Sequence, residues 1–288
     1  MRRLPSRSPV ALALALTLMG VGYVGMLLWA EYRRPLRPRV EPGGRRLLRN
    51  AVMAASAGLV VQLAERPLVN PLAEYCERRR VGLTNFLPVR AGWMSGAFWR
   101  DLIAVVLMDY TLFRWHMLMH RWDVLYRLHQ VHHSDLDLDV STATRFHFAE
   151  MLASVPWRLA QVRVIGTSPR ALRIWQRATL LSILFHHSNI RLPVRLERLL
   201  GRFIATPRLH SIHHSVLREE QDSNWSNGLT LWDFLHGTYR ADPPPENIEI
   251  GVPHYRAREQ VTFGKLLVMP RVPASLARRP PNGRVPKR

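Results

Sequence analysis

The sequence predicts an all-α protein that helices anchor in a membrane. Residues 9–30 read PVALALALTLMGVGYVGMLLWA and carry no charge over 22 positions, whereas about 20 apolar residues suffice to cross a bilayer as a helix. Further apolar stretches follow at 51–64, 102–115 and 171–185. No segment sustains the alternation of apolar and polar residues that is typical of strands. We therefore expect a helical membrane anchor joined to a helical cap.

The first apolar run is expected to be a retained transmembrane anchor, residues 1–31. A cleaved signal peptide is the alternative because Arg2 and Arg3 precede the run, but the apolar core of a signal peptide usually spans only about 7–15 residues. Seven arginines follow between Arg33 and Arg49, against three before the run. The positive-inside bias then places this later loop in the cytoplasm and the amino terminus outside.

Residues 32–98 are expected to form the basic loop and a membrane-associated hairpin. The stretch 51–64 is short for an independent span, so it could pair with a neighbour as a hairpin, tilt, or lie partly in the membrane interface. The next region, 99–245, begins with a stretch long enough to cross the membrane. Pro156 and then Gly166 are expected to divide its middle, with Ser168 or Thr167 capping a helix that starts near Pro169. Residues 246–288 form a C-terminal extension, expected to be disordered from about residue 270 because proline and arginine dominate it.

Composition excludes several classes of function. A formal net charge of +20 over 288 residues would suggest nucleic-acid binding in a soluble protein. The basic residues flank apolar segments instead of forming a stripe with interleaved aromatic residues, so we expect no nucleic-acid partner and a basic face toward anionic lipid headgroups. Cys76 is the only cysteine, which excludes an internal disulfide and a thiolate-held iron–sulfur cluster.

Clustered histidines are the candidate metal ligands of this chain. Of the 13 histidines, 11 lie between residues 116 and 214. Eight of them form the patterns HxxxH, HxxHH and HxxHH: His116, His120, His129, His132, His133, His210, His213 and His214. Residues three and four apart share one face of a helix, so each cluster directs its imidazoles toward one point. Imidazole suits iron, copper and zinc, and a tetrahedral zinc takes only four ligands. Eight converging histidines therefore indicate two metal ions.

Several neighbouring residues are candidates for further ligands or for groups that orient the ligands. His147 and the pair His186 and His187 are the histidine candidates, whereas His236 and His254 are expected to be structural. Carboxylates that could orient imidazole rings and offset metal charge are Asp109, Asp135, Asp137, Asp139, Glu150, Asp222 and Asp233. Asp109 lies seven residues before His116, two turns away on one helix face, where it could accept an imidazole proton or act as a cap instead.

Two metal ions beside a membrane suggest a reaction class. Iron with open coordination positions can reduce dioxygen to an oxidant that breaks a C–H bond, whereas zinc has no redox states. A site at the cytoplasmic ends of membrane helices is most easily reached by a lipid. The chain has no GxGxxG fingerprint and no CxxCH haem attachment site, so a separate partner is expected to supply electrons.

The ordered motifs resemble those of the fatty acid hydroxylase and sterol desaturase superfamily of integral membrane di-iron oxygenases. The resemblance covers roughly residues 100–240. It rests on DYTLFRWH at 109–116, LHQVHHS at 128–134, RFH at 145–147, FHHSN at 185–189, TPRLHSIHHS at 206–215, DSNW at 222–225 and LWDFLHGTY at 231–239. The ordered set is far more specific than any single HxxHH.

The resemblance implies a helical anchor with a cytosol-facing cap that holds two irons, with dioxygen as co-substrate. It also implies a cytochrome, ferredoxin or similar electron donor, and a lipid substrate that is hydroxylated or desaturated. His187 becomes a ninth ligand beside the eight clustered histidines. The possible ligands or orienting groups are His147, His186, Asp109, Glu150 and Asp222.

Two other classes of protein also use clustered histidines. A membrane protein that binds or transports zinc or copper would place its ligands along several spans near the bilayer midplane, whereas these histidines cluster at helix ends and in polar segments. A haem-bearing electron carrier needs only two axial histidines for each haem and gives no reason for two HxxHH motifs. The sequence therefore favours the oxygenase.

Overall fold

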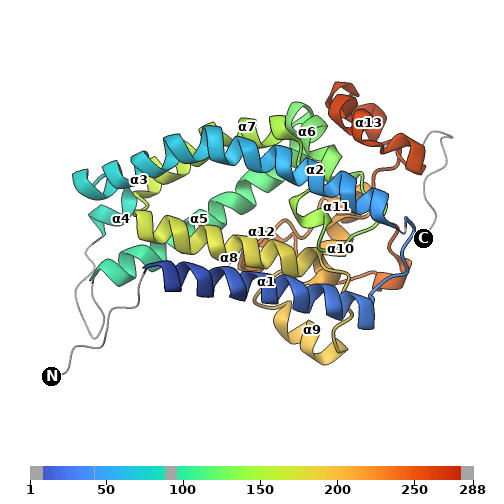
Figure 1. The fold of residues 1–288 in the computed structure, drawn as a ribbon, viewed down its shortest axis with the longest axis horizontal. Helices are drawn as coiled ribbons and strands as arrows, with labels where there is room; N and C mark the ends of the chain where they lie inside the picture. The colour runs from blue at the N-terminus through green and yellow to red at the C-terminus, as the bar shows by residue number, and fades with distance from the viewer. Residues whose placement is uncertain (1–8, 42, 88–95, 280–288) are drawn as a thin grey trace.

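The computed structural model describes residues 9–41, 43–87 and 96–279, and helices without a β-strand make up the fold of this part of the chain. Long helical segments run along the long axis of the molecule (Figure 1). They are α1 (Pro9–Arg33), α2 (Gly44–Val60) continued by α3 (Arg66–Arg79), α5 (Gly96–Arg121), α7 (Phe148–Ile165) and α8 (Pro169–His187). The predicted all-α class is confirmed.

Three segments have the length and apolar composition of membrane spans: Leu14–Arg33, Gly44–Phe86 and Gly96–Arg121. Apolar side chains on α1, such as Leu18 and Val21, are largely exposed in the isolated chain, as a helix that faces lipid requires. The segment Gly96–Arg121 is the most enclosed of the three spans. It is also the span that carries histidines, which lie in its last turns.

The hairpin expected within residues 32–98 is not observed in the described part of that region. Instead α2 passes through a five-residue π-helical segment, Val61–Glu65, straight into α3. A π-helical turn accommodates an extra residue without ending the helix, and Pro67 stands in the first turn of α3. The chain turns only after Arg80, which adopts the left-handed conformation, and continues into the short α4 (Leu83–Phe86).

Pro156 does not divide α7, contrary to the sequence-based expectation. Contacts with α5 hold the helix together around it: Trp157 Nε1 donates to Thr111 O at 3.2 Å, and Gln161 Nε2 donates to Thr111 Oγ1 at 2.6 Å. The second predicted break is present, because α7 ends at Gly166 with φ 77°. Ser168 then accepts from the Ala171 N–H as the N-cap of α8, as predicted.

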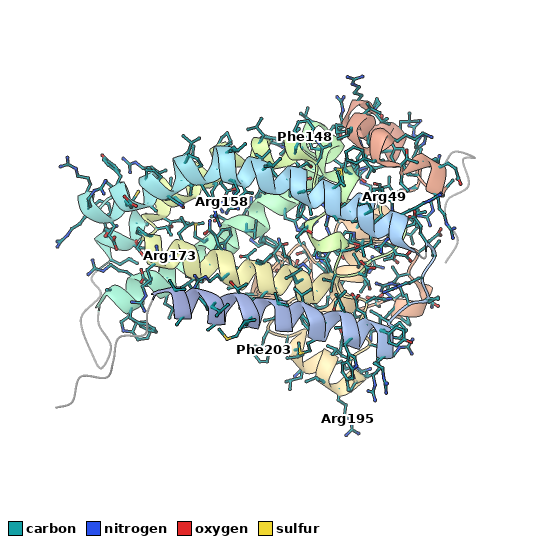
Figure 2. All side chains as sticks on the ribbon, in the orientation of Figure 1. Arg49, Phe148, Arg158, Arg173, Arg195 and Phe203 are labelled. Atoms are coloured by element: carbon teal, nitrogen blue, oxygen red, sulfur yellow. The ribbon has the colours of Figure 1, made fainter. Side chains whose placement is uncertain are left out.

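Shorter helices form a cap at the end of the bundle where α1, α5 and α8 terminate (Figure 1). They are α6 (Asp123–His133), α9 (Val194–Leu200), α10 (Pro207–His213), α11 (Arg218–Gln221), α12 (Leu231–His236), α13 (Phe263–Val268) and α14 (Ala274–Ala277), with 3₁₀ turns at Thr142–Thr144, Pro245–Asn247, Arg258–Gln260 and Met269–Arg271. Figure 2 shows Arg195 and Phe203 on the outer side of this cap. Every histidine cluster lies at the cap end.

The C-terminal extension is ordered further than the sequence suggested. Residues 270–279 were expected to be disordered, yet they include α14, and Ala274 and Ala277 are buried in a cluster with Tyr126 of α6. Arg278 also stacks on the Tyr126 ring, with 4.0 Å between Cζ and the ring centroid. Small alanines between the prolines and arginines let this segment pack closely, a feature that overall composition does not reveal. Residues 280–288 lie outside the described residues.

Candidate metal centre

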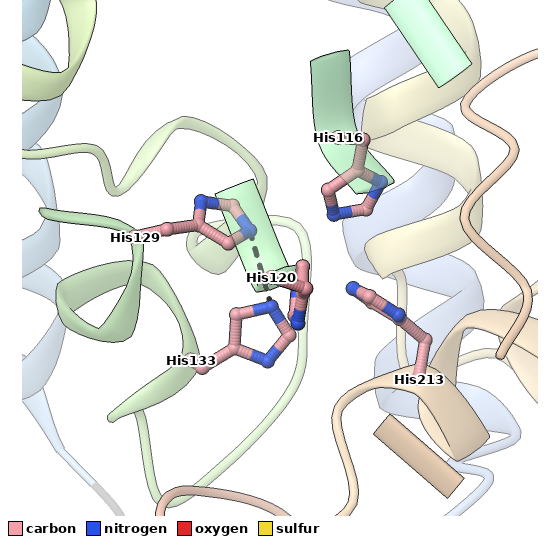
Figure 3. A group of neighbouring side chains, drawn as sticks. All are labelled: His116, His120, His129, His133 and His213. Carbon is pink, nitrogen blue, oxygen red and sulfur yellow. Dashed lines mark hydrogen bonds between the residues drawn. The ribbon is translucent and has the colours of Figure 1, made fainter. Parts of the chain in front are cut away.

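Helix ends deliver nine buried histidines to one place. The last turns of α5 carry HxxxH, α6 ends in HxxHH, α8 ends at His187, and α10 with the residue after it carries the second HxxHH. All nine side chains are buried. Figure 3 shows five of them converging from three directions. The local spacing predicted each cluster, and the meeting of four helix ends brings the clusters together.

The nine histidines divide into two groups, and within each group one nitrogen from every ring lies within 4.8 Å of the others. The first group is His116, His120, His129, His133 and His213, and the second is His132, His187, His210 and His214. In the second group, Nε2 of His187 lies 3.0 Å from Nε2 of His132 and 3.0 Å from Nε2 of His210. Metal–nitrogen bonds of about 2.1 Å put two ligand nitrogens at right angles roughly 3.0 Å apart. The spacing therefore fits ligands of a shared ion.

Backbone carbonyls orient several of these rings. Nδ1 of His116 lies 2.8 Å from Trp225 O, Nδ1 of His213 lies 2.9 Å from Ser223 O, and Nδ1 of His187 lies 2.7 Å from Ile183 O. A carbonyl oxygen only accepts, so each Nδ1 carries the proton and donates. This tautomer leaves the Nε2 lone pair free to bind a metal ion.

Glu150 orients one more ring and brings negative charge to the site. Its Oε1 accepts from Nδ1 of His129 at 2.8 Å, and both side chains are buried. The structure thus places Glu150 where an orienting carboxylate was expected. A carboxylate behind a metal-binding imidazole raises the basicity of the ring and fixes its direction.

Burial opposes protonation of three histidines in the second group. It lowers the pKa of His187 to about 3 and lowers the pKa values of His132 and His210 well below the ordinary value. Nε2 of His213 and both ring nitrogens of His120 have no hydrogen-bond partner among the described residues. A buried polar atom without a partner costs free energy. A metal ion would remove this cost, because neutral imidazoles that point to one centre are suitable metal ligands. The residues therefore fit two metal ions.

A cavity of about 170 Å³ meets both groups of histidines. Apolar side chains from α5, α7, α8 and the segment before α7 form most of its wall: Leu112, Trp115, Met119, Phe146, Met151 and Ile183. The histidines that line it are His116, His129, His132, His187 and His210. Polar side chains such as Ser154, Arg158 and Asn227 also line it. A cavity whose wall is mostly apolar can hold a hydrocarbon chain beside two metal ions.

Comparisons with known proteins agree with this geometry. Residues 102–238 match the family model for fatty acid hydroxylases. This match covers just under half of the chain, and together with the relatives described below it supports the fatty acid hydroxylase and sterol desaturase superfamily. The resemblance seen in the sequence is thus confirmed, and the matched region contains all nine histidines of the two groups.

Curated relatives in this superfamily carry names that refer to lipids. An ornithine lipid hydroxylase of Rhizobium tropici is 30% identical over 164 residues, 54% of this chain and 48% of the relative. An alkylglycerol monooxygenase of Homo sapiens is 25% identical over 74% of this chain and 45% of its own length. A cholesterol 25-hydroxylase of Mus musculus is 28% identical over 51% of this chain and 49% of its own length. The chain spans about half the length of these relatives, and no solved structure matches it significantly.

None of the five residues named as possible ligands or orienting groups belongs to either group of histidines, and three of them make their contacts elsewhere. His147 caps α7: its Nδ1 accepts from the Ala149 N–H, and its Nε2 lies 3.3 Å from Leu267 O. Asp109 accepts from Trp232 Nε1 at 2.7 Å and from the Leu229 N–H at 3.0 Å. It therefore holds α12 and the residues just before it against α5, and its carboxylate does not bond to His116. Asp222 pairs with Arg218 one turn earlier on the surface.

His186 lies beside the centre without joining either group. Its ring centroid is 4.1 Å from that of His210, and neither ring nitrogen has a hydrogen-bond partner among the described residues. Its neighbour His187 takes the position in the second group. The choice between the two adjacent histidines depends on the direction in which the last turn of α8 points, and that direction is set by tertiary packing.

One group that supports the centre was missed in the sequence. Arg46, in the loop interpreted as a lipid-facing basic segment, is buried and makes a bidentate pair with Asp135, with N···O distances of 3.0 and 2.8 Å. It also bonds Asp139 at 2.5 Å and Thr142 Oγ1 at 3.0 Å. Arg49 pairs with the buried Glu41. These contacts fix the segment after the first HxxHH against α2, and a basic loop gives no sequence signal that its arginines are buried.

Proposed function

We propose that this chain is a membrane-bound, oxygen-dependent oxidoreductase that uses two iron ions to hydroxylate a C–H bond of a lipid. The observation that carries the proposal is the convergence of nine buried imidazoles in two groups at the wall of one apolar cavity. A structural zinc site is closed by its own four ligands. Here a cavity that can hold a hydrocarbon chain reaches both groups.

The two groups assign the ligands of each ion. His116, His120, His129, His133 and His213 would hold one iron, and His132, His187, His210 and His214 would hold the other. Iron bound in this set supplies the redox chemistry that activates dioxygen for attack on a C–H bond, which zinc does not offer. Glu150 keeps the proton on Nδ1 of His129 and thereby directs Nε2 toward the ion.

The residues of the cavity position the substrate. Phe146 stacks on the ring of His132 with 4.7 Å between centroids, so one wall of the cavity fixes a ligand ring and also excludes water. Leu112 and Ile183 offer apolar surface to an alkyl chain. Holding a C–H bond close to the reactive centre in a dry cavity lowers the entropic part of the barrier.

Lipid hydroxylation is favoured over desaturation. The names of three relatives are those of hydroxylases or monooxygenases, and they refer to an ornithine lipid, an alkylglycerol and cholesterol. Three segments suited to cross a membrane support a multi-pass membrane protein. A lipid substrate reaches such a site from the bilayer without crossing water.

The proposal includes a cytoplasmic site and an external electron donor. The arginines between Arg33 and Arg49 favour a cytoplasmic position for the cap end of the bundle by the positive-inside bias. The sequence lacks a dinucleotide fingerprint and a haem attachment motif, so a cytochrome, ferredoxin or similar protein would deliver the electrons.

Metal analysis and product analysis together test the proposal. The purified full chain is expected to contain about two irons. Lipid extracts from cells with and without the protein should differ by species that have gained one oxygen, detected by mass spectrometry. His132→Ala and His213→Ala each remove a ligand from a different group, so each should lower iron content and abolish oxygen-dependent activity. His254→Ala, outside both groups, serves as the control and should change neither.

A different result would favour another class. Full occupancy by zinc or copper, with no dioxygen uptake on any lipid, would indicate a membrane protein that binds or transports metal. Loss of two hydrogens without gain of oxygen would keep the two-iron assignment and replace hydroxylation by desaturation.

A further inference from the structure

The cavity beside the histidines extends away from them along three helices. It is lined on α8 from His187 back to Thr179 and on α7 from Glu150 forward to Arg158. Eight residues of helix rise about 12 Å. Because α7 starts in the cap and α8 ends there, Thr179 and Arg158 lie together at the end of the cavity that is remote from the metal centre. Figure 2 shows Arg158 among the long helices, away from the cap.

Arg158 lines this end of the cavity, and some of its N–H donors have no acceptor in the described part of the chain. Nη1 donates to Gln161 Oε1 at 2.6 Å, but the Glu65 carboxylate lies 3.8 Å from Nε, beyond hydrogen-bond distance. Nε has no hydrogen-bond partner among the described residues, although the side chain is only 12% exposed. A guanidinium carries five N–H donors, and each one left unsatisfied when buried costs free energy. The group is therefore suited to bind an oxygen atom that enters the cavity.

The surroundings of Arg158 give a second observation. Glu65 is buried and lies at the end of the π-helical segment within the candidate span Gly44–Phe86. Single π-helical turns within long helices occur frequently at functional sites. Ionisable residues at membrane depth are costly and usually mark function. Trp175 stacks on the guanidinium, with 4.2 Å from Cζ to the ring centroid, and holds it in place.

The charges indicate which oxygen is bound. Glu65 lies close enough to offset the charge of Arg158, so a second carboxylate placed there would be repelled by the first. A neutral acceptor accepts from the free N–H groups without adding charge. Between this polar end and the histidines the wall is mostly apolar, with Leu112, Trp115 and Ile183.

We propose that Arg158 binds the ester or amide carbonyl of an acyl lipid and thereby sets which carbon is presented to the metal centre. The proposal rests on the lipid-hydroxylating function proposed above. The substrate is then an uncharged acyl group whose carbonyl lies about 12 Å, two helical turns, from the C–H bond that is oxidised. Arg158 is a specificity-determining residue in this scheme, and Glu65 excludes the free acid.

Binding measured without oxygen or reductant tests the proposal. The full chain in detergent is titrated with the methyl ester of a long-chain fatty acid, with the free acid and with the n-alkane of equal length, and tryptophan fluorescence reports occupancy beside Trp115. The ester should bind about tenfold or more tightly than the alkane, as one hydrogen bond to a charged group predicts. Arg158→Met should abolish this preference. Arg163→Gln, on the exposed side of the same helix, should retain it.

Further variants keep the proposal testable if Arg158→Met folds poorly. The double variant Glu65→Gln with Arg158→Met removes both charges and leaves no unpaired ion, and it should likewise bind ester and alkane equally. Glu65→Gln alone should raise the affinity for the free acid relative to the ester. Equal affinity of the unsubstituted chain for ester and alkane, or an unchanged preference in either Arg158 variant, would overturn the proposal.

Product analysis separates this inference from the proposed function. With iron content equal to that of the unsubstituted chain, Arg158→Met should yield oxygen at several carbons where the unsubstituted chain yields one. A single unchanged position contradicts the role of Arg158. A chain that prefers the ester but holds no iron and consumes no oxygen would contradict the proposed function while leaving carbonyl binding in place.

Discussion

Individual histidines of the centre depend on residues that carry no metal-binding signal. The carbonyls of Trp225 and Ser223 fix the rings of His116 and His213, and both carbonyls belong to the segment between α11 and α12. This segment is held in turn by Asp233, whose Oδ1 and Oδ2 accept from the N–H groups of Trp225 and Ser226 at 2.9 and 3.0 Å. A side chain that contacts no histidine therefore sets the direction of two imidazoles.

Glu150 offers the sharpest test at the level of one residue. Glu150→Gln removes the negative charge behind His129 but keeps a side-chain oxygen that can accept from Nδ1. Loss of such an orienting carboxylate typically lowers metal affinity by about 10–100-fold. We expect that range for iron, measured by competition with a chelator.

Glu74→Gln provides the matched control for this change. Glu74 lies on α3, is 57% exposed and pairs with Arg78 on the surface. The same chemical change there should leave iron affinity unaltered. Equal affinities for the Glu150 variant and the unsubstituted chain would show that the contact with His129 has no role in metal binding.

The structure brings the nine histidines named from the sequence into two groups, and the sequence could point to them because their signal is local. A spacing of three or four residues places rings on one helix face whatever the rest of the chain does. The roles of Asp109 and His147 were not predictable in this way, because the partners of Asp109, Trp232 and Leu229, lie more than 100 residues away. His147 caps a helix with a ring nitrogen, a role usually taken by Ser, Thr, Asp or Asn.

At the scale of elements, the first turn of α2 stabilises the segment that follows the metal-binding histidines of α6. Arg46 and Arg145 surround the fully buried Asp135, which follows the first HxxHH by two residues. Burial alone would raise the pKa of Asp135, but the two guanidinium groups outweigh it and hold that pKa below its usual value. The ionised carboxylate therefore stabilises the junction between α2 and the segment after α6.

This junction predicts a dependence of stability on pH. Because the folded-state pKa of Asp135 is lowered, its stabilisation is fully present above the unfolded value of about 3.9 and is lost as the pH falls through the folded value. We expect the thermal unfolding temperature to fall below about pH 4 for this reason. Asp135→Asn should be less stable at pH 7, by about 3–5 kcal/mol for a broken buried ion pair, and should show a weaker decline in acid. Parallel curves for both chains would contradict this account.

The elements that sequence patterns misjudged share one physical cause. Apolar length suggested a hairpin near residues 51–64, but a π-helical turn at Val61–Glu65 carries the helix onward. Pro156 suggested a break, but hydrogen bonds from Trp157 and Gln161 to α5 hold α7 intact. Local helix propensity predicts structure only weakly, and tertiary contacts override it. A capping signal such as Ser168 depends only on residues next to it in the sequence, and the cap that it predicts is present.

At the scale of the whole molecule, the helix directions predict that the two ends of the bundle face opposite sides of the membrane. The segment Leu14–Arg33 enters the cap, Gly44–Phe86 leaves it and Gly96–Arg121 returns. We expect these segments to make three passes, which would put the cap and the turn after Arg80 on opposite sides of the membrane. The arginines that follow α1 favour the cytoplasm for the cap. Arg80 would then lie outside.

Single cysteines can test this orientation because the chain has only one native cysteine, and Cys76 is buried. In a Cys76→Ser background, Asp242→Cys places a thiol in the cap at a side chain that is 81% exposed, and Arg80→Cys places one at the other end. A membrane-impermeant maleimide added to intact cells should label the Arg80 variant at once. It should label the Asp242 variant only after the membrane is opened. The reverse pattern would put the metal centre on the outer side, and an electron donor would then have to be sought there instead of in the cytoplasm.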